Sequence, residues 1–598
     1  MEKTTEKKAI FITKERIARL LPSFLVALAI ALIVFLAAPL AIYTANINEF
    51  NFPFSDILGY LFLFFAIALV AVFLIQALLP KIGYKIVRGF FLGVALMLFL
   101  QSNYLNIGLH SLAGDDIITV REMVGNANFI INTIVWVVVI VGFTLASTLI
   151  KKQNIVKIVA IVVSIVVLFT TTLNVVVSLI STDFSQGSVV EEIKKEEPNY
   201  VPKFLTTKNM TSVASSRNVV MFLVDRFDTK KYFEPVMDDW VEYFEELGGF
   251  TYFNDNISMY GRTYPSVGYM LTGKEFNPEE RRKDFFIRTY NNNNTLSRLN
   301  SEGYSVNIYT DPYYGYYDAF YLPDYIDNVV TVSEDSLYRE TLQKHELFRK
   351  NMMMSLYRTF PFAAKDIVGG ISSTSLNKFV VYRSNEMEFD STSSDMRDTY
   401  KNISSNDFTK QGEKKFSFIH ISGCHNVDYD KNWKPIKGLA KKDMNYSIHN
   451  SFAIIKEYIE EMKKQGVYEN STIIITGDHA FADTNYRALD KEKLTALFVK
   501  PAGDTEKKFK VSSAPVCQDD LWATIFKSEN IAFDESEFGK SVFDYSENEE
   551  RTRKHVWHNF DSTKTRFIEN IYEIKGSASE FKNWKRISHK TFNREIYD

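Results

Sequence analysis

The chain has 598 residues, too many for one compact core, and its 46% hydrophobic content averages over two unlike parts. The formal net charge of −3 argues against a nucleic-acid-binding protein, which would carry a basic stripe or a strongly basic domain. Only two cysteines occur, Cys424 and Cys517, so the chain has no disulfide framework.

The N-terminal third is mostly apolar and holds five segments of membrane-spanning length. A helix needs about 20 apolar residues to cross the hydrocarbon core of a bilayer. The predicted spans are 21–43, 57–79, 87–106, 128–150 and 157–181. Five such segments in series favour a transmembrane bundle over the buried helices of a soluble core.

Basic residues gather on alternate connections between these spans. The positive-inside rule therefore predicts a cytoplasmic N-terminus, and an odd number of spans then places everything after residue 181 outside the cell. We expect a multi-pass protein of the plasma membrane. The basic residues that set this orientation are Lys7, Lys8, Lys14, Arg16 and Arg19 before the first span, Lys81, Lys85 and Arg88 before the third, and Lys151, Lys152 and Lys157 before the fifth.

The remainder of the chain predicts a linker and one further domain. Residues 1–181 form the transmembrane domain, residues 182–217 are polar and predict a linker or juxtamembrane segment, and residues 218–598 predict an extracellular catalytic domain. Short apolar runs alternate there with amphipathic stretches, which predicts an α/β domain with a largely parallel central sheet. The predicted strands are 219–224, 305–309, 416–421 and 472–475, and the predicted helices are 229–247, 344–368 and 444–465.

Polar residues that suit a metal site follow three of the predicted strands. Asp225 follows 219–224, His425 follows 416–421 after Ser-Gly-Cys, and Asp478 and His479 follow 472–475 after Thr-Gly. Ligands gather at the carboxyl ends of strands in sheets of this kind, so we expect these side chains to meet. Two carboxylates and an imidazole are enough protein ligands for one divalent ion.

A candidate nucleophile lies in the sequence Arg262-Thr263-Tyr264-Pro265-Ser266. Pro265 suits the first turn of a helix, which places the Thr263 hydroxyl where free backbone N–H groups favour an anion. An open position on the metal ion would take the Thr263 oxygen and activate it for attack on a phosphate.

At these residues the domain resembles the alkaline-phosphatase/sulfatase superfamily, and within it the lipoteichoic acid synthases. Those enzymes also have five membrane spans followed by an extracellular sulfatase-like domain. The resemblance implies that Asp225, Thr263, Asp478 and His479 bind the metal, and that Thr263 carries the phosphoglyceryl group. The matching segments are Asn218–Asp225, Arg262–Thr263 with Thr263–Gly273, Gly423–His425, Asp478–His479, and Ser512–Thr524 with Asp519 and Asp520.

The sequence departs from the synthase pattern at three places. Asp225 stands where the synthases have a glutamate, and Ala480 stands where a glycine usually follows the Asp-His pair. The Trp-x-Arg stretch that grips the substrate phosphate has no match, and the tyrosine-rich segment 309–317 takes its place in the order. Aromatic rings with polar tips suit a sugar or polyol, although a packed surface loop is an equal interpretation.

The sequence thus predicts metal-dependent transfer of a phosphoglycerol-type group through a phospho-threonine intermediate. The donor is a membrane phospholipid resembling phosphatidylglycerol, and the acceptor is a cell-wall glycan, a glycolipid or a teichoic-acid-type polymer. Thr263 is the nucleophile, His425 steadies the phosphate or shuttles a proton, and Arg262 balances charge. The cofactor is one divalent metal, for which we favour Mn²⁺ and leave Zn²⁺ and Mg²⁺ open.

Three other interpretations use the same fold. One is a phosphodiesterase or phosphatase with water as the acceptor, one is a phosphoethanolamine transferase, and one is a non-catalytic surface domain, which Ala480 and the missing arginine suggest. A true sulfatase is disfavoured, because Thr263 stands where a Cys or Ser is needed. A two-zinc site needs more histidines, and only His420 and His425 lie near a predicted strand end.

Overall fold

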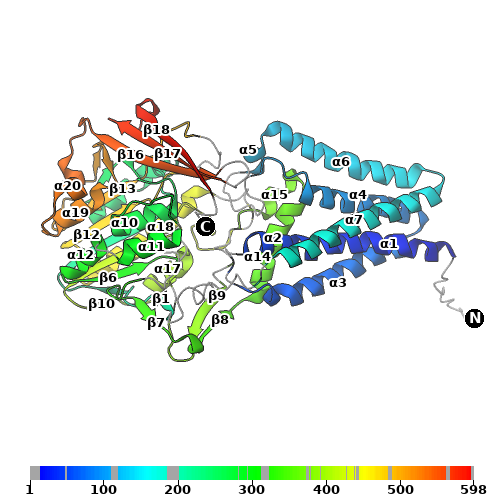
Figure 1. The fold of residues 1–598 in the computed structure, drawn as a ribbon, viewed down its shortest axis with the longest axis horizontal. Coiled ribbons are helices and arrows are strands. Elements are labelled where there is room, and N and C mark those ends of the chain that lie inside the picture. Colours follow the sequence, from blue (N-terminus) through cyan, green and yellow to red (C-terminus); the bar gives the residue numbers. More distant parts are fainter. Residues whose placement is uncertain are drawn as a thin grey trace, which may run out of the picture. The chain divides into compact units, whose positions relative to one another are not determined.

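The computed structural model describes residues 14–47, 50, 52–109, 119–182, 184, 201–280, 282–291, 294–311, 322–371, 376, 379–390, 392–425, 427–436, 438, 443–481, 488–560 and 566–593. The chain divides into two compact units, and each is described by itself (Figure 1). The helical unit comprises residues 1–196, 341–380 and 437–441, and the α/β unit comprises 197–340, 381–436 and 442–598. The segment 341–380, which the sequence analysis placed in the domain 218–598, thus belongs to the helical unit.

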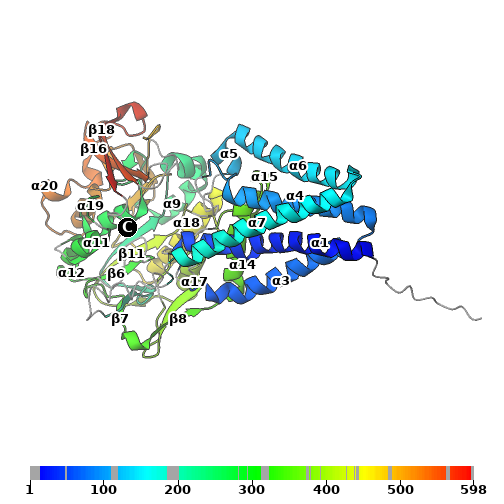
Figure 2. The same ribbon diagram turned by 45° about the vertical axis from the view of Figure 1, so that its right-hand side comes forward.

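The helical unit holds five helices that are long and apolar enough to cross a membrane, which confirms the predicted five-helix bundle (Figure 2). The first is built from α1, a π-helical turn and α2, and the third begins earlier than predicted, at Lys81. In this longer third helix, the buried Arg88 donates to Ser147 Oγ at 3.0 Å and to Gln153 Oε1 at 2.9 Å. The helices are α1 (Lys14–Leu32), the turn Ile33–Ala37, α2 (Ala38–Ala45), α3 (Ser55–Leu78), α4 (Lys81–Asn103), α5 (Val120–Val124), α6 (Asn126–Leu149) and α7 (Gln153–Ser181).

Two glycines one turn apart let α4 and α6 approach closely. A Cβ on Gly89 would lie 2.5 Å from the carbonyl oxygen of Phe143, and one on Gly93 would lie 2.9 Å from the Cα of Ile140. Small residues at such spacing are the usual means by which membrane helices pack backbone to backbone.

Two further helices of the helical unit come from the segment 341–380. They are α14 (Lys344–Thr359) and α15 (Phe362–Val368), and they replace the single predicted helix 344–368. The break falls at Phe360–Pro361, since proline disfavours a helical conformation in the residue before it. Apolar residues of α14 pack with α2 and α3, and Tyr357 and Phe362 pack with residues of α5.

The α/β unit is built around a seven-stranded sheet in which four of the six neighbouring pairs are parallel, which confirms the predicted fold class. In this sheet β13 alone runs antiparallel to both of its neighbours. The strands in spatial order are β14 (Lys510–Ser512), β4 (Thr251–Phe253), β13 (Leu497–Lys500), β12 (Ser471–Thr476), β3 (Arg217–Val224), β11 (Lys414–Ile421) and β6 (Tyr304–Tyr309).

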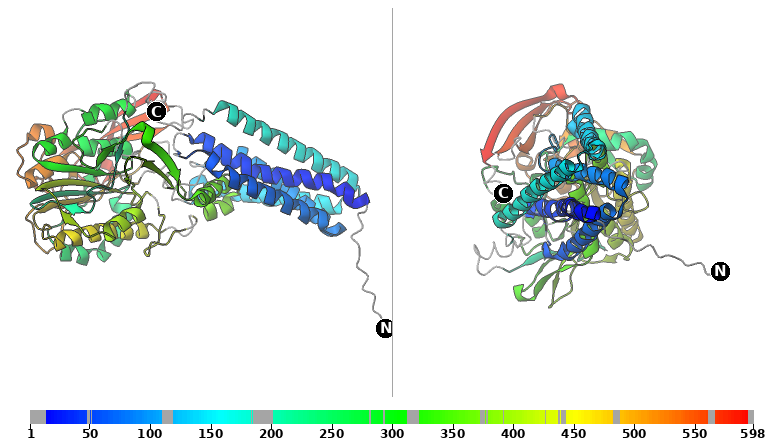
Figure 3. Two further views of the ribbon diagram at one scale, coloured as in Figure 1. Left: turned by 90° about the horizontal axis from the view of Figure 1, so that it is seen from below. Right: turned by 90° about the vertical axis from the view of Figure 1, so that its right-hand side faces the viewer.

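Helices cover both faces of this sheet, so its central strands read as continuous apolar runs (Figure 3). Val219, Met221 and Leu223 of β3 face the core formed with α10, α11, α12 and α19, while Phe222 packs edge-on against Tyr458 of α18. The predicted helix 229–247 is instead a π turn (Thr229–Phe233), a 3-10 turn (Glu234–Asp239) and α9 (Val241–Leu247). The remaining helices are α10 (Thr263–Thr272), α11 (Arg282–Asn291), α12 (Thr295–Ser301), α17 (Met396–Ser404), α18 (Met444–Lys464), α19 (Asp520–Ser528) and α20 (Glu535–Phe538).

Smaller sheets complete the α/β unit. The largest is a three-stranded antiparallel sheet near the C-terminus, and its Val556 bridges to Tyr260, just before α10. The other strands form two-stranded pairs. The strands are β16 (Thr552–Phe560), β17 (Arg566–Lys575) and β18 (Trp584–Asn593), and the pairs are β1 (Lys203–Leu205) with β7 (Val329–Thr331), β2 (Ser212–Val213) with β10 (Thr409–Lys410), β5 (Asn256–Ile257) with β15 (Val516–Cys517), and β8 (Leu337–Thr341) with β9 (Val380–Ser384).

Replacing Gly89 by valine is expected to separate α4 from α6, because the new side chain overlaps backbone atoms that cannot move aside. Over-packing of this kind costs about 1–3 kcal/mol, so the melting temperature of the detergent-solubilised protein should fall. The matched control is Gly142→Val on α6, where a Cβ meets nothing within 4 Å. Equal melting temperatures for the two variants would contradict the close packing.

Candidate active site

Three side chains meet at the carboxyl edge of the large sheet. Asp225 directly follows β3, and Asp478 and His479 follow the neighbouring strand β12, which runs parallel to it. Each offers one ligand atom, and these atoms all lie within 4.8 Å of one another. All three side chains are buried. The geometry therefore brings together the residues that the sequence analysis selected from strand ends.

Close backbone packing fixes the position of Asp225. Gly423 has a φ of +48°, and a Cβ there would lie 2.9 Å from the backbone nitrogen of Asp225. The next residue, Cys424, donates its N–H to the Asp225 carbonyl at 2.8 Å. On the other side, the N–H of Arg226 donates to Asp478 Oδ1 at 2.8 Å, which ties the two acidic residues together.

The predicted nucleophile lies beside this cluster. Thr263 is the first residue of α10, and its Oγ1 lies 3.2 Å from His479 Nε2. His479 Nδ1 lies 2.6 Å from the carbonyl oxygen of Ala480. A carbonyl only accepts, so Nδ1 carries the hydrogen and Nε2 presents its lone pair to the cluster.

The negative charges of the two carboxylates repel one another. Burial raises the pKa of Asp478, and the charge of Asp225 raises it further. Burial also acts to raise the pKa of Asp225, but His425 and His420 outweigh it, so the pKa of Asp225 is lowered. Burying both as anions without a compensating charge is costly.

One oxygen of each carboxylate is available to a cation. Asp225 Oδ1 and Asp478 Oδ2 are buried, and neither accepts a hydrogen bond from the described part of the chain. Two such oxygens with an imidazole nitrogen form a donor set suited to manganese or zinc. The residues present therefore fit one divalent metal ion, with the Thr263 oxygen next to it.

His420 is a site residue to which the sequence analysis gave no role. Its Nε2 lies 3.5 Å from Asp225 Oδ2, and its Nδ1 lies 2.7 Å from the Thr310 hydroxyl at the end of β6. Burial acts to lower the pKa of His420, but nearby carboxylates, Asp225 foremost, outweigh it and raise that pKa. The available signal was its place one residue from the end of β11, the strand that pairs with β3.

Gln518 and Ser266 join α10 to the acidic loop behind the cluster. The Ser266 hydroxyl donates to the Asp478 carbonyl at 2.5 Å, and Gln518 Nε2 donates to the same carbonyl at 2.9 Å. Gln518 Oε1 accepts the N–H of Met259 at 2.9 Å. Both side chains hold the start of α10 against Asp478, which keeps Thr263 in place.

His425 lies in the loop that follows β11 and is half-buried. Its positive charge lowers the pKa of Asp225. Residues 312–321, which hold most of the predicted tyrosine-rich segment, lie outside the described residues.

Arg262 has its contacts on the C-terminal sheet. Its Nε donates to the carbonyl oxygen of His558 at 3.3 Å, and a terminal nitrogen donates to Asn559 Oδ1 at 3.5 Å. Its guanidinium carbon lies 5.8 Å from the centre of the Trp557 ring. These contacts with β16 orient the residue that precedes the nucleophile.

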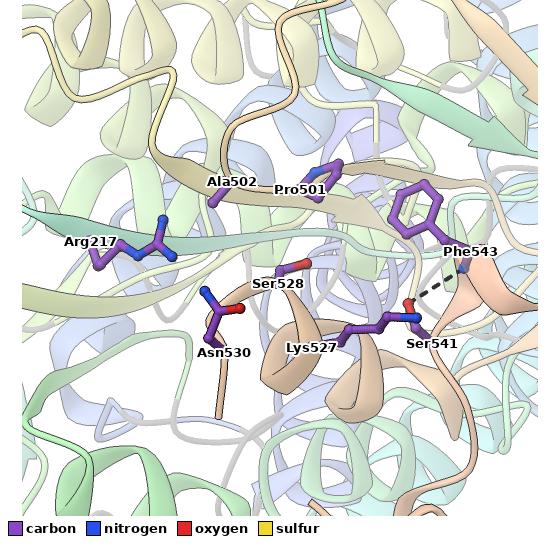
Figure 4. A pocket seen from close by; sticks show the side chains of 8 residues that line it. All are labelled: Arg217, Pro501, Ala502, Lys527, Ser528, Asn530, Ser541 and Phe543. Atoms are coloured by element: carbon purple, nitrogen blue, oxygen red, sulfur yellow. Dashed lines mark hydrogen bonds between the residues drawn. The ribbon is translucent and has the colours of Figure 1, made fainter. Parts of the chain in front are cut away.

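A pocket of about 320 Å³ lies at the other end of the strands (Figure 4). Its lining includes Arg217, the first residue of β3, whereas Asp225 follows the last residue of that strand. This pocket is therefore separate from the cluster at the carboxyl edge. It is lined by Arg217, Pro501, Ala502, Lys527, Ser528, Asn530, Ser541 and Phe543.

Residues 241–528 match the family model described as Sulfatase. The matched range contains Thr263, His420, His425 and the pair Asp478–His479, while Asp225 lies before it. A comparison with curated proteins gave no match.

The chain also matches solved structures, all of them at low sequence identity. The lipoteichoic acid synthase LtaP from Listeria monocytogenes is 12% identical, with 65% of this chain and 89% of that chain covered at a TM-score of 0.33. The phosphonate monoester hydrolase SpPMH from Silicibacter pomeroyi is 10% identical, with 64% and 91% covered at a TM-score of 0.34. A protein in the alkaline phosphatase superfamily from Vibrio parahaemolyticus is 10% identical, with 66% and 84% covered at a TM-score of 0.33. At these TM-scores none of the three structures supports a conclusion about the function of this chain.

Metal binding is expected to stabilise the protein through the two carboxylates. Added Mn²⁺ should raise the melting temperature of the metal-free protein. At a concentration one hundred times the Kd, it should add about 2.7 kcal/mol to the free energy of unfolding. Asp478→Asn should abolish this gain, yet its metal-free form should be at least as stable as the wild type because repulsion with Asp225 is removed.

The matched control is Asp519→Asn, since Asp519 is also a buried carboxylate but accepts from the Tyr269 hydroxyl at 2.9 Å, outside the cluster. Metal content by elemental analysis provides the second measurement. An Asp478→Asn protein that retains metal as the wild type does would contradict the proposed ligands.

Proposed function

Because residues 241–528 match the Sulfatase family model, we propose that this protein transfers a phosphoglycerol-type group from a membrane phospholipid to a cell-surface acceptor. The donor resembles phosphatidylglycerol. The acceptor is a hydroxyl group of a cell-wall glycan, a glycolipid or a teichoic-acid-type polymer. The five membrane-length helices support a lipid donor, because they hold the chain at the bilayer where its head groups lie.

One observation carries the proposal: the Thr263 hydroxyl lies 3.2 Å from His479 Nε2, at the edge of the Asp225–Asp478–His479 cluster. A hydroxyl beside a cation site at a helix start is a nucleophile arrangement suited to phosphate esters. A formylglycine sulfatase would need a Cys or Ser at this position, and this chain has Thr263.

In the first half of the reaction the Thr263 oxygen attacks the phosphorus atom of the lipid phosphodiester. A bond forms between that oxygen and phosphorus, the bond from phosphorus to the lipid oxygen breaks, and diacylglycerol leaves with a proton on that oxygen. The phosphoglyceryl group is then esterified to Thr263. A divalent metal held by Asp225, Asp478 and His479 would lower the pKa of the hydroxyl and offset the negative charge of the phosphate.

In the second half an acceptor hydroxyl attacks the same phosphorus atom. The bond between phosphorus and the Thr263 oxygen breaks, and the acceptor proton returns to that oxygen. The positive end of the α10 helix dipole, at which Thr263 lies, stabilises the negative charge on phosphate in both halves. His425, whose charge lowers the pKa of Asp225, steadies the phosphate or moves the proton. Arg262, the residue before the nucleophile, balances charge, although its guanidinium group contacts β16.

The proposal includes an orientation for the membrane. We place the N-terminus in the cytoplasm and the sulfatase-like domain outside the cell, because basic residues mark the connections that the positive-inside rule assigns to the cytoplasm. Donor lipid and surface acceptor are then on the same side as Thr263.

Mass spectrometry of the Thr263 peptide tests the intermediate. After incubation of the purified protein with phosphatidylglycerol and Mn²⁺, the peptide should carry an added phosphoglyceryl group. Thr263→Val, which keeps the side-chain shape but lacks the hydroxyl, should lose the adduct and reduce diacylglycerol release by at least about a hundredfold, as expected when a nucleophile is removed. Thr263→Ser keeps a hydroxyl and should retain the adduct.

The fate of the head group separates the alternatives. Transfer gives a phosphorylated glycan or polyol, hydrolysis gives free glycerophosphate, and a phosphoethanolamine adduct on Thr263 would replace the proposed donor. Diacylglycerol release that is undiminished in Thr263→Val would contradict the proposed nucleophile.

A further inference from the structure

Two basic side chains lie on either side of the turn between α14 and α15 in the helical unit. Arg358 is the next-to-last residue of α14, and Lys365 lies in the middle of α15. The Lys365 ammonium group donates to the carbonyl oxygen of Tyr357, the residue directly before Arg358, and the pKa of Lys365 is lowered by burial and further by the charge of Arg358. The helix pair thus brings two cations together.

Lys365 is fully buried, yet no carboxylate of the described residues balances its charge. Its ammonium group donates to the carbonyl oxygen of Tyr357. It also lies 5.0 Å from the ring centre of Tyr357 and 5.9 Å from that of Phe362. An ammonium has three donors, and the contacts given by the described residues use only one of them for a hydrogen bond.

Arg358 is half-buried, and burial lowers its pKa. Its guanidinium group makes no hydrogen bond or ion pair with the described residues. The neighbouring arginine on the same helix, Arg349, forms an ion pair with Glu346 at 2.6 Å, so α14 does supply a carboxylate partner elsewhere. A guanidinium group presents five donors in a fixed fork that matches a phosphate.

The nearest carboxylate in the sequence, Asp366, forms no ion pair with either of these cations in the described part of the chain. Its Oδ1 accepts the backbone N–H of Val120 at the start of α5, at 2.9 Å. Burial raises the pKa of Asp366, and Glu122 raises it further, while neither Arg358 nor Lys365 contributes to it.

The helix pair is attached to one end of the bundle. Asn106, just after α4, donates to the Arg358 carbonyl at 3.0 Å, and the Phe362 N–H donates to Asn132 Oδ1 near the start of α6 at 3.0 Å. Asn132 is in turn joined to Gln101 of α4 at 2.9 Å. The two cations therefore lie where α4 ends and α6 begins, at the level at which membrane-spanning helices meet lipid head groups.

We propose that Arg358 and Lys365 form a binding site for the phosphodiester head group of an anionic membrane lipid. The lipid phosphate would accept hydrogen bonds from the half-buried guanidinium fork of Arg358, and its negative charge would favour the protonated form of the buried Lys365 nearby. Free phosphate shares this chemistry, but the position at the end of the bundle favours a lipid.

The test measures lipids retained by the purified full-length protein. The protein is reconstituted with phosphatidylcholine and phosphatidylglycerol, extracted in mild detergent, and analysed by native mass spectrometry. The wild type should retain phosphatidylglycerol in preference to phosphatidylcholine. Arg358→Gln should reduce that retention about tenfold, the effect expected for losing one charge-assisted contact to phosphate.

The matched control is Arg349→Gln on the same helix, which should retain lipid as the wild type does. Lys365→Met tests the second cation, and because Lys365 is fully buried its melting temperature is checked first. Should Lys365→Met fail to fold, lipid retention by Arg358→Gln, at the half-buried position, still tests the proposed site. Equal retention by Arg358→Gln and the wild type would overturn the site.

Two further measurements separate this site from its alternatives. Inorganic phosphate at millimolar concentration should not displace the retained lipid, and displacement would identify a general phosphate site instead. Retention is measured in a Thr263→Val background and does not require turnover, so loss of the lipid site and failure of the proposed transfer give different results. Retention that also disappears in Asp478→Asn would place the lipid at the metal cluster and overturn the proposal.

Discussion

The repulsion between Asp225 and Asp478 is the constraint on which the site depends. Two parallel strands, β3 and β12, end side by side and deliver these carboxylates to one buried place. Hydrogen bonds donated by Arg226, Ser266 and Gln518 hold the loop of Asp478 in position. A cation between the carboxylates would offset their repulsion, and in the proposed reaction it would activate the neighbouring Thr263 hydroxyl.

Much of this site can be predicted from the sequence alone. A carboxyl end of a parallel strand is a defined place, so Asp225 and Asp478–His479 were predicted to meet although they are far apart in the chain. Thr263 followed from a proline in the first turn of a helix, and the structure starts α10 at that residue. The five spans also followed from composition, because a helix in lipid must be apolar over a fixed length.

Other parts depend on tertiary contacts that no local pattern encodes. His420 alternates with core residues along β11, and only the pairing of β11 with β3 brings it to Asp225. Gln518 acts through hydrogen bonds to distant residues, so its spacing gave no signal. The segment 341–380 reads as an ordinary helix of the α/β domain, but its apolar residues pack in the helical unit. Its cations Arg358 and Lys365 became informative only when their surroundings were known.

The most direct measurement is an experimental structure of the protein with Mn²⁺, using anomalous scattering at the manganese edge. We expect one peak bonded to Asp225, Asp478 and His479, with the Thr263 oxygen as a neighbour. A peak elsewhere in the α/β unit, or carboxylates that stay empty of metal at saturating Mn²⁺, would contradict it.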